Sequence, residues 1–179
     1  MRKNIQPVIF LLLLSRLVKV SSWIGNIRIQ KLLFLVQEES PKLIENGFKF
    51  TPYKYGPYSD DVCDIALSLA DRGLVELEQD GQQGFIKSYG VTSAGMEKAT
   101  QLKSTYSEIE NAVEIIADKY AKLNDELLLL YVYTKYPEFT FKSEIKIEVL
   151  EIAKKNFAVL QKKAIEIGFK ESELDLVGV

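Results

Sequence analysis

Apolar positions recur every three or four residues along much of the chain, a spacing that predicts amphipathic helices. The first helix is expected from Pro7, a residue suited to a first helical turn, to about Val20. The second is expected over about residues 27–39, where one face carries Ile29, Leu32, Leu33 and Val36. A short helical turn is predicted over residues 41–47, because Gly47 suits its end.

The middle of the chain combines turn signals with short strand patterns. Phe48–Phe50 alternates as a strand does, and the stretch TPYKYGPYS at residues 51–59 then turns the chain. Ser59 is expected to cap a helix that ends at Gly73. Two alternating runs, residues 74–79 and 85–92, flank the turn cluster DGQQG and predict a β-hairpin.

Helical patterns follow this hairpin. They are expected from about Ala94 after a Thr92 or Ser93 cap, over residues 106–123, from Asn124 to Pro137, and over residues 143–167. The order helix, helix, helix, β-ribbon, helix predicts a mainly α fold. We expect a winged helix-turn-helix with a two-stranded β-wing over residues 1–104, and a C-terminal helical extension packed on it over residues 105–179.

The composition excludes several kinds of chemistry. The 179 residues include no histidine and one cysteine, Cys63. This excludes histidine-based acid–base or nucleophilic catalysis, an ordinary His/Cys zinc site and a disulfide within the chain. We therefore expect that the protein is not an enzyme, has no catalytic or metal-binding residue and uses no cofactor. The apolar run Pro7–Leu14 is too short for a membrane span, so we expect a buried first helix in a cytoplasmic protein with no membrane contact.

Charge is distributed unevenly along the chain. Residues 1–59 carry nine Lys/Arg and three Asp/Glu, whereas residues 60–179 carry 14 and 22. Such asymmetry fits a nucleic-acid face, a self-assembling surface or a charged protein partner. The candidate DNA-binding residues are Arg28, Lys31, Lys54 and Lys87. The predicted recognition helix, however, begins with Asp60, Asp61 and Asp64, whose carboxylates repel phosphates.

Several pieces of the sequence together resemble a known family. They are IRIQKLLFLVQ, the Y-G-P turn of FTPYKYGPYSDDV, the glycine-ended helix of residues 62–73, and YGVTSAGMEKA. In this combination the chain resembles the Panacea (SocA-like antitoxin) superfamily and its YwgA-like bacterial and archaeal winged-helix relatives, over about residues 5–100. The resemblance implies a non-enzymatic regulatory module. Some relatives neutralise a toxin by binding or hand it to a protease, and others are treated as transcription factors.

The tyrosine-rich stretch allows two interpretations. Its rings either wedge between neighbouring helices or form an exposed anchor for a protein partner. Tyr55 and Tyr58 are the candidate protein-binding residues, because they flank the turn. For stability we expect a division in which Tyr53 and Tyr55 are mainly structural and Tyr58 is mainly exposed.

We expect a non-enzymatic regulatory module that acts by protein–protein contact, as an antitoxin or adaptor does, with a toxin as one possible partner. The alternative is a DNA-binding transcriptional regulator that uses the winged helix-turn-helix as a dimer. The apolar positions of residues 143–167 exceed what a lone peripheral helix shows to water, so we also expect a homodimer through this helix or the Leu127–Leu130 helix.

Overall fold

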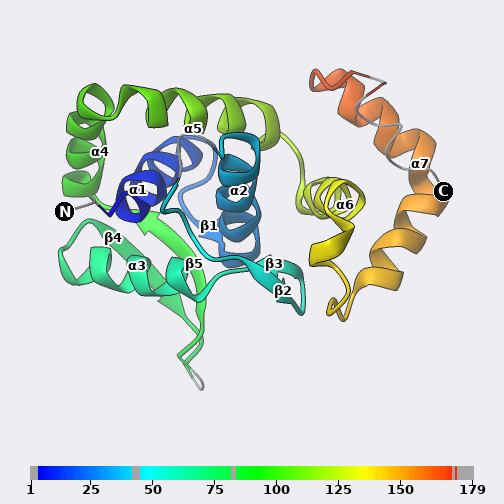
Figure 1. Cartoon of the computed structure of the whole chain (residues 1–179), viewed down its shortest axis with the longest axis horizontal. Helices are drawn as coiled ribbons and strands as arrows, with labels where there is room; N and C mark the ends of the chain where they lie inside the picture. Colours follow the sequence, from blue (N-terminus) through cyan, green and yellow to red (C-terminus); the bar gives the residue numbers. More distant parts are fainter. Residues whose placement is uncertain (1–3, 42–44, 82–83, 171, 173–179) are drawn as a thin grey trace. The chain divides into compact units, whose positions relative to one another are not determined.

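The computed structural model describes residues 4–41, 45–81, 84–170 and 172. This part of the chain is mainly helical, with two small antiparallel sheets (Figure 1). It divides into two compact units: unit 1 lies within residues 1–49 and 59–117, and unit 2 within residues 50–58 and 118–179. The helical turn expected over residues 41–47 includes residues 42–44, which lie outside the described residues.

Helix α1 (Gln6–Leu17) is the centre of unit 1. Residues 8–15 are all buried, which is expected for a helix that is apolar on every side. Figure 1 shows α3, α4 and α5 around it. The expectation of a buried first helix is confirmed. Among the described residues, none of the helices combines the length and the apolar character that crossing a membrane requires.

A three-stranded sheet completes this core. Strands β1 (Ile24–Gly25), β4 (Val75–Gln79) and β5 (Ile86–Val91) are arranged antiparallel in the order β1-β5-β4. The buried Tyr89 of the central strand contacts the Phe10 ring edge-on and donates a 2.7 Å hydrogen bond to Asn26 Oδ1. The predicted hairpin is therefore confirmed, whereas the two-residue edge strand β1 was not expected.

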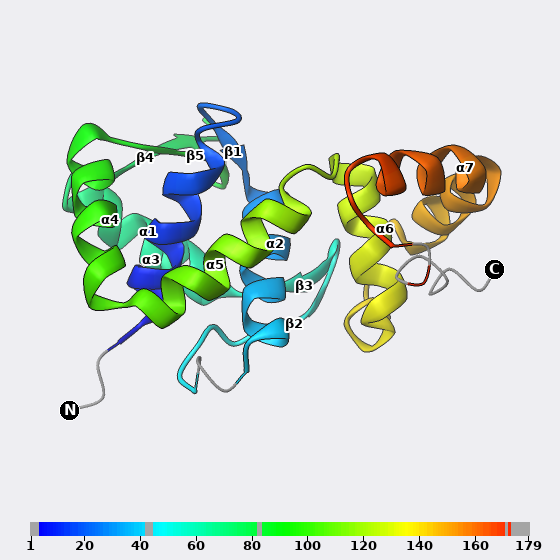
Figure 2. The same ribbon diagram turned by 90° about the horizontal axis from the view of Figure 1, so that it is seen from above.

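Helices frame the sheet and α1. They are α2 (Asn26–Glu39), α3 (Asp60–Asp71), α4 (Ser93–Thr105) and α5 (Ser107–Tyr120). Figure 2 shows α5 running across α1, and Arg16 of α1 pairs there with Glu110 at 2.6 Å and with Glu114 at 3.1 Å. The predicted Thr92 cap is confirmed, because its side chain accepts a 3.0 Å hydrogen bond from Gly95 N.

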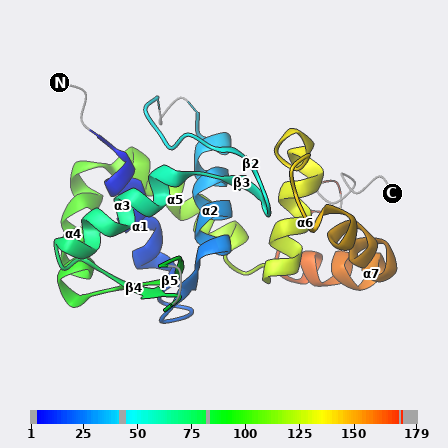
Figure 3. The same ribbon diagram turned by 90° about the horizontal axis from the view of Figure 1, so that it is seen from below.

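Unit 2 combines a hairpin with the C-terminal helices. The hairpin comprises β2 (Thr51–Tyr53) and β3 (Gly56–Tyr58), and the helices are α6 (Asp125–Lys135), the short 3₁₀ helix η1 (Pro137–Phe139) and α7 (Lys146–Glu166). Figure 3 shows β3 beside α6. The rings of Tyr120, Tyr131 and Phe169 pack together with centroids 5.0–6.1 Å apart. Helix α6 starts at Asn124 as predicted, and the Asn124 side chain caps it by accepting a 2.9 Å hydrogen bond from Leu127 N.

Two local expectations are wrong. The predicted strand at Phe48–Phe50 forms instead at Thr51–Tyr53, where the chain has a pairing partner in β3. Ser59 precedes α3 but makes no side-chain cap. Its backbone is held instead by the Gln30 amide, which donates to Ser59 O and accepts from Ser59 N, both at 3.0 Å. Both partners are buried, so this pair replaces the hydrogen bonds that water would supply.

Candidate protein-binding site

The tyrosine-rich stretch forms a tight β-hairpin, which we call the tyrosine hairpin (residues 51–58). Thr51 pairs with Tyr58, Pro52 with Pro57, and Tyr53 with Gly56, so Lys54 and Tyr55 form the turn. Gly56 has a φ of +84°, a left-handed conformation that costs glycine little and other residues more. The Y-G-P sequence therefore supplies the backbone geometry that closes the hairpin.

The segment that follows α6 supports the tip of the hairpin. Glu144 N donates a 2.9 Å hydrogen bond to Lys54 O, and the Lys54 ammonium lies 3.3 Å from Glu144 Oε1. The hydrogen bond with Glu144 raises the pKa of Lys54. The Tyr133 and Ser143 hydroxyls share a 2.7 Å hydrogen bond, and burial raises the pKa of Tyr133. The two Glu144 contacts therefore hold the turn of the hairpin against the segment that follows α6.

The hairpin exposes its rings while burying part of its backbone. Tyr53 is 47% exposed and Tyr55 is 40% exposed, whereas Gly56 and Pro57 are buried. Tyr58 is the least exposed of the three tyrosines, and its ring lies 5.1 Å from that of Tyr53. The expected burial is therefore wrong for Tyr53 and Tyr55, and the expected exposure is wrong for Tyr58. The physical reason for the exposure of Tyr53 and Tyr55 is the hairpin, because residues in or beside its turn project outward from the two paired strands.

An exposed aromatic residue that sequence reasoning missed lies in the same unit. Phe141 is 68% exposed and follows η1 by two residues, in the segment that supports the hairpin tip. A large aromatic ring just after a proline-induced helix end is the signal that could have indicated it, because such a residue has no helix face to bury it. Tyr53, Tyr55 and Phe141 are candidate contact residues for a protein partner.

The candidate DNA-binding residues are not equivalent. Lys31 is 2% exposed within α2, where residues 29–36 are all buried, so it cannot reach a phosphate at the surface. This corrects its assignment as a DNA-binding candidate. Burial lowers the pKa of Lys31 to about 7. Lys54 is paired with Glu144, Arg28 is half-buried, and Lys87 is exposed on β5.

Acidic side chains accompany the elements that would meet DNA. At the start of α3, Asp60 and Asp64 are exposed, and Asp61 accepts a 3.0 Å hydrogen bond from Lys49 N. On β4, Glu76 and Glu78 are exposed, and Glu78 accepts a 2.5 Å hydrogen bond from the Ser88 hydroxyl. These carboxylates give both elements a charge that phosphates repel.

The described residues contain no cluster of three or more His, Cys, Asp or Glu side chains that could hold a metal ion. Comparison with protein-family models and with curated proteins finds no match to this chain. The functional assignment therefore depends on the geometry of the tyrosine hairpin and on the charges around it.

Proposed function

We propose that this chain is a non-enzymatic regulatory module that acts by protein–protein contact, with the tyrosine hairpin as its contact surface. The observation that carries the proposal is the combination of a fixed backbone with exposed rings. Tyrosine supplies a large contact area with few rotatable bonds, and a hairpin already ordered before binding loses little entropy on association. The Glu144 contacts to Lys54 provide that order.

We further propose that unit 1 is a winged helix-turn-helix. The order of its elements supports this assignment: α1, β1, α2, α3 and then the β4–β5 ribbon, with strands arranged β1-β5-β4. In this assignment α2 and α3 are the helix-turn-helix and the β4–β5 ribbon is the wing. The resemblance to SocA-like antitoxins then suggests an antitoxin- or adaptor-like role for the whole chain, with a toxin as one possible partner.

Comparative affinity capture tests the proposed contact. The full chain is immobilised and exposed to extract from cells that make it naturally, beside the double variant Tyr53→Ala/Tyr55→Ala. Phe85→Ala removes an aromatic side chain that is 66% exposed in unit 1 and is the matched control. We expect one protein to be retained by the wild type and the control and to be depleted on the double variant. Equal recovery on all three would contradict the role of the hairpin.

The alternative function is a DNA-binding regulator, and the element order of unit 1 is the observation that favours it. The exposed carboxylates at the start of α3 and on β4 oppose it. We therefore expect only weak binding to a random duplex at physiological salt, with Lys87→Ala reducing the little affinity there is. A dissociation constant near 10⁻⁸ M for some sequence, falling steeply as salt is added, would favour the alternative.

A further inference from the structure

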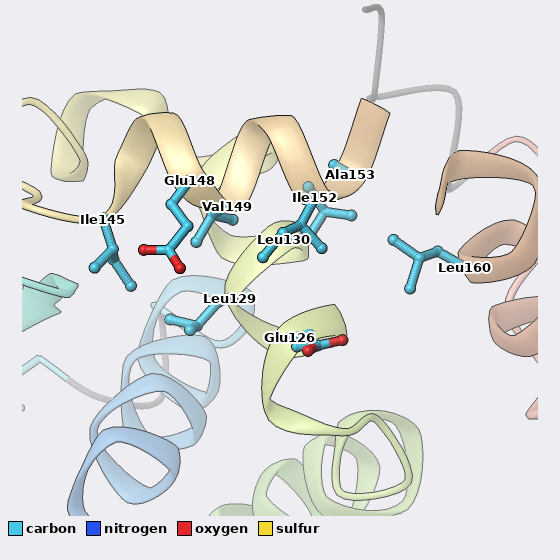
Figure 4. Close-up of a pocket in the computed structure, with 9 residues that line it drawn as sticks. All are labelled: Glu126, Leu129, Leu130, Ile145, Glu148, Val149, Ile152, Ala153 and Leu160. Atoms are coloured by element: carbon cyan, nitrogen blue, oxygen red, sulfur yellow. The ribbon is translucent and has the colours of Figure 1, made fainter. Parts of the chain in front are cut away.

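Helices α6 and α7 leave an apolar groove of about 240 Å³ between them, which we call the α6–α7 groove. Leu129 and Leu130 of α6 line it from one side, and Val149 and Ile152 of α7 line it from the other (Figure 4). Ile145, Val149 and Ile152 follow one another at steps of four and three residues, so they form one stripe. The side of α7 that faces the groove is therefore apolar over about two helical turns.

Two carboxylates border this apolar surface. Glu126 lies three residues before Leu129 on α6, and it lines the same groove. Glu148 lies four residues before Ile152 on α7 and lines the groove from the other helix. Both glutamates are exposed, and within the described ranges neither forms an ion pair with a lysine or an arginine. The groove therefore presents negative charge to whatever occupies it.

One end of the groove adjoins the tyrosine hairpin. Figure 4 shows Ile145 at one end of the lining and Leu160 at the other. Ile145 directly follows Glu144, whose backbone N–H donates a 2.9 Å hydrogen bond to Lys54 O in the turn of the hairpin. Groove and hairpin are therefore neighbouring surfaces of unit 2, and one partner can contact both.

The size and charge of the groove limit what can fill it. Sites for drug-sized ligands are typically about 300–1,000 Å³, so this smaller groove better suits a few apolar side chains. An amphipathic helix inserts the apolar side chains of one face into a groove in this way. The bordering carboxylates attract lysine and arginine, and they repel acidic side chains and anionic lipid headgroups. These properties together select a basic amphipathic helix.

We propose that the α6–α7 groove binds a basic amphipathic helix of the protein partner. Its apolar residues occupy the space between Leu129 and Ile152, and its lysine or arginine residues lie beside Glu126 and Glu148. This inference rests on the proposed function and deepens it, because it gives the chemistry of the partner's binding segment. A stable interface uses roughly 20–30 residues on each side, more than the tyrosine hairpin contains, so a second contact area beside the hairpin is expected.

Designed helical peptides test the groove directly. The probe has leucine at positions i, i+3, i+4 and i+7 and lysine at the flanking positions, and fluorescence anisotropy measures its binding to the full chain. One comparison peptide has glutamate in place of every lysine. Another has the composition of the probe in an order that leaves its leucines on no common face. We expect saturable one-to-one binding of the probe and binding about tenfold weaker or more for both comparison peptides.

Charge variants of the chain locate the binding site. Glu126→Gln/Glu148→Gln should weaken probe binding about fivefold to tenfold, because it removes both carboxylates from the border of the groove. Glu97→Gln/Glu108→Gln is the matched control, because it removes the same charge from exposed helical positions of unit 1. The control should bind the probe as the wild type does.

A second pair of variants keeps the test valid if the charge variant does not fold. Leu129→Ala shortens a side chain that lines the groove and should weaken probe binding about tenfold. Leu67→Ala changes a side chain that is 42% exposed on α3 and should leave binding unchanged. A wild type that shows no saturable probe binding would overturn the proposal. So would equal binding of all three peptides, or wild-type affinity in the folded groove variants.

The tyrosine variant separates this inference from the proposed function. Tyr53→Ala/Tyr55→Ala should bind the probe as the wild type does, because the probe occupies the groove alone. Partner capture that depends on the tyrosines, in a chain that does not bind the probe, would refute the groove and leave the proposed function standing. Probe binding together with equal partner recovery on the wild type and the tyrosine variant would instead refute the role of the hairpin.

Discussion

The backbone of the tyrosine hairpin is held more tightly than its rings. Gly56 and Pro57 are buried and Lys54 O accepts a hydrogen bond from Glu144 N, yet Tyr53 and Tyr55 keep about half of their surface in solvent. An aromatic side chain contributes to stability mainly through the apolar area it buries. These two rings therefore contribute less to folding than the conformation of the strands that carry them.

Alanine substitutions separate the contributions of these tyrosines to stability. Tyr55→Ala is expected to lower the free energy of unfolding by less than about 1 kcal/mol, because its ring is 40% exposed. Tyr58→Ala is expected to cost about 1–3 kcal/mol, because Tyr58 is less exposed and contacts the Tyr53 ring. Urea denaturation of the two variants measures both values. Large and equal losses would show that the rings are structural.

Lys31 gives unit 1 a predictable pH dependence. Its pKa is lowered by burial to about 7, whereas in the unfolded chain it is about 10.4. Between these values the unfolded chain binds the proton more tightly, so the free energy of unfolding rises as pH increases through this window. Below pH 7 the penalty for burying the charged ammonium is fully present.

Lys31→Met removes this penalty and is only one atom shorter. We expect the stability of the variant relative to the wild type to be higher at pH 6 than at pH 10 by about 3–5 kcal/mol, because only the wild type carries this pH dependence. Thermal or urea denaturation at pH 6, 7.5 and 10 measures the difference. Lys98→Met, a substitution of a partly exposed lysine on α4, is the matched control. A difference that does not vary with pH would contradict this account of Lys31.

At the scale of elements, the junction between α4 and the β4–β5 ribbon depends on one glycine. A Cβ atom added at Gly95 would lie 2.0 Å from Leu74 O and 2.7 Å from Val91 Cγ2. Because the nearest atom belongs to the backbone, the clash cannot be relieved by rotating a side chain. The same carbonyl oxygen accepts a 3.2 Å hydrogen bond from the N–H of Thr92, the N-cap residue of α4.

Gly95→Ala is therefore expected to destabilise the chain by about 1–3 kcal/mol or more, although alanine favours helices over glycine elsewhere. Gly81→Ala is the control, because nothing lies within 4 Å of its added Cβ and its φ is not in the left-handed region. Its effect should stay within about 0.5 kcal/mol. Differential scanning calorimetry of both variants makes the comparison, and an unchanged melting temperature for Gly95→Ala would refute the packing argument.

Elements with strong local signals could be predicted from the sequence, and elements defined by distant partners could not. The apolar period, the cap expected at Thr92 or Ser93 and the start expected at Asn124 located α4 and α6 closely. By contrast, β1 has two residues and exists only because Ile24 and Gly25 pair with β5. Phe48–Phe50 alternates but is not a strand of either described sheet, and burial of Phe48 explains its apolar character.

Predictions for some single residues were wrong for the same reason, because distant parts of the chain determine their surroundings. Lys31 follows the polar side of its helical pattern, but α2 is covered on every side over residues 29–36. Ser59 has the residue type and position of a cap, yet its backbone N–H and C=O are hydrogen-bonded by the distant Gln30 amide. For the candidate site, the sequence indicated the aromatic stretch and its turn. It did not indicate which rings are exposed, because ring exposure depends on how the two strands pair.

At the scale of the whole molecule, two features concern function: the distribution of acidic residues and the unit to which the tyrosine hairpin belongs. The net excess of acidic residues lies beyond residue 59, and it includes the exposed carboxylates of α3 and β4. The tyrosine hairpin belongs to the same compact unit as the C-terminal helices, although residues 50–58 are far from them in sequence. The exposed aromatic residues lie on an ordered hairpin, and the candidate DNA-binding elements are acidic. We propose that these two properties suit a protein partner better than DNA.

The affinity of the captured partner for single-residue variants tests this central claim most directly. Isothermal titration calorimetry would compare the wild type, Tyr55→Ala and the control Ile115→Ala, whose side chain is 54% exposed on α5. Tyr55→Ala is expected to weaken binding by about 2 kcal/mol or more, roughly thirtyfold, with a nearly unchanged melting temperature. Ile115→Ala should bind as the wild type does. Wild-type affinity in Tyr55→Ala, or an equal loss in both variants, would contradict the proposal that this hairpin binds the partner.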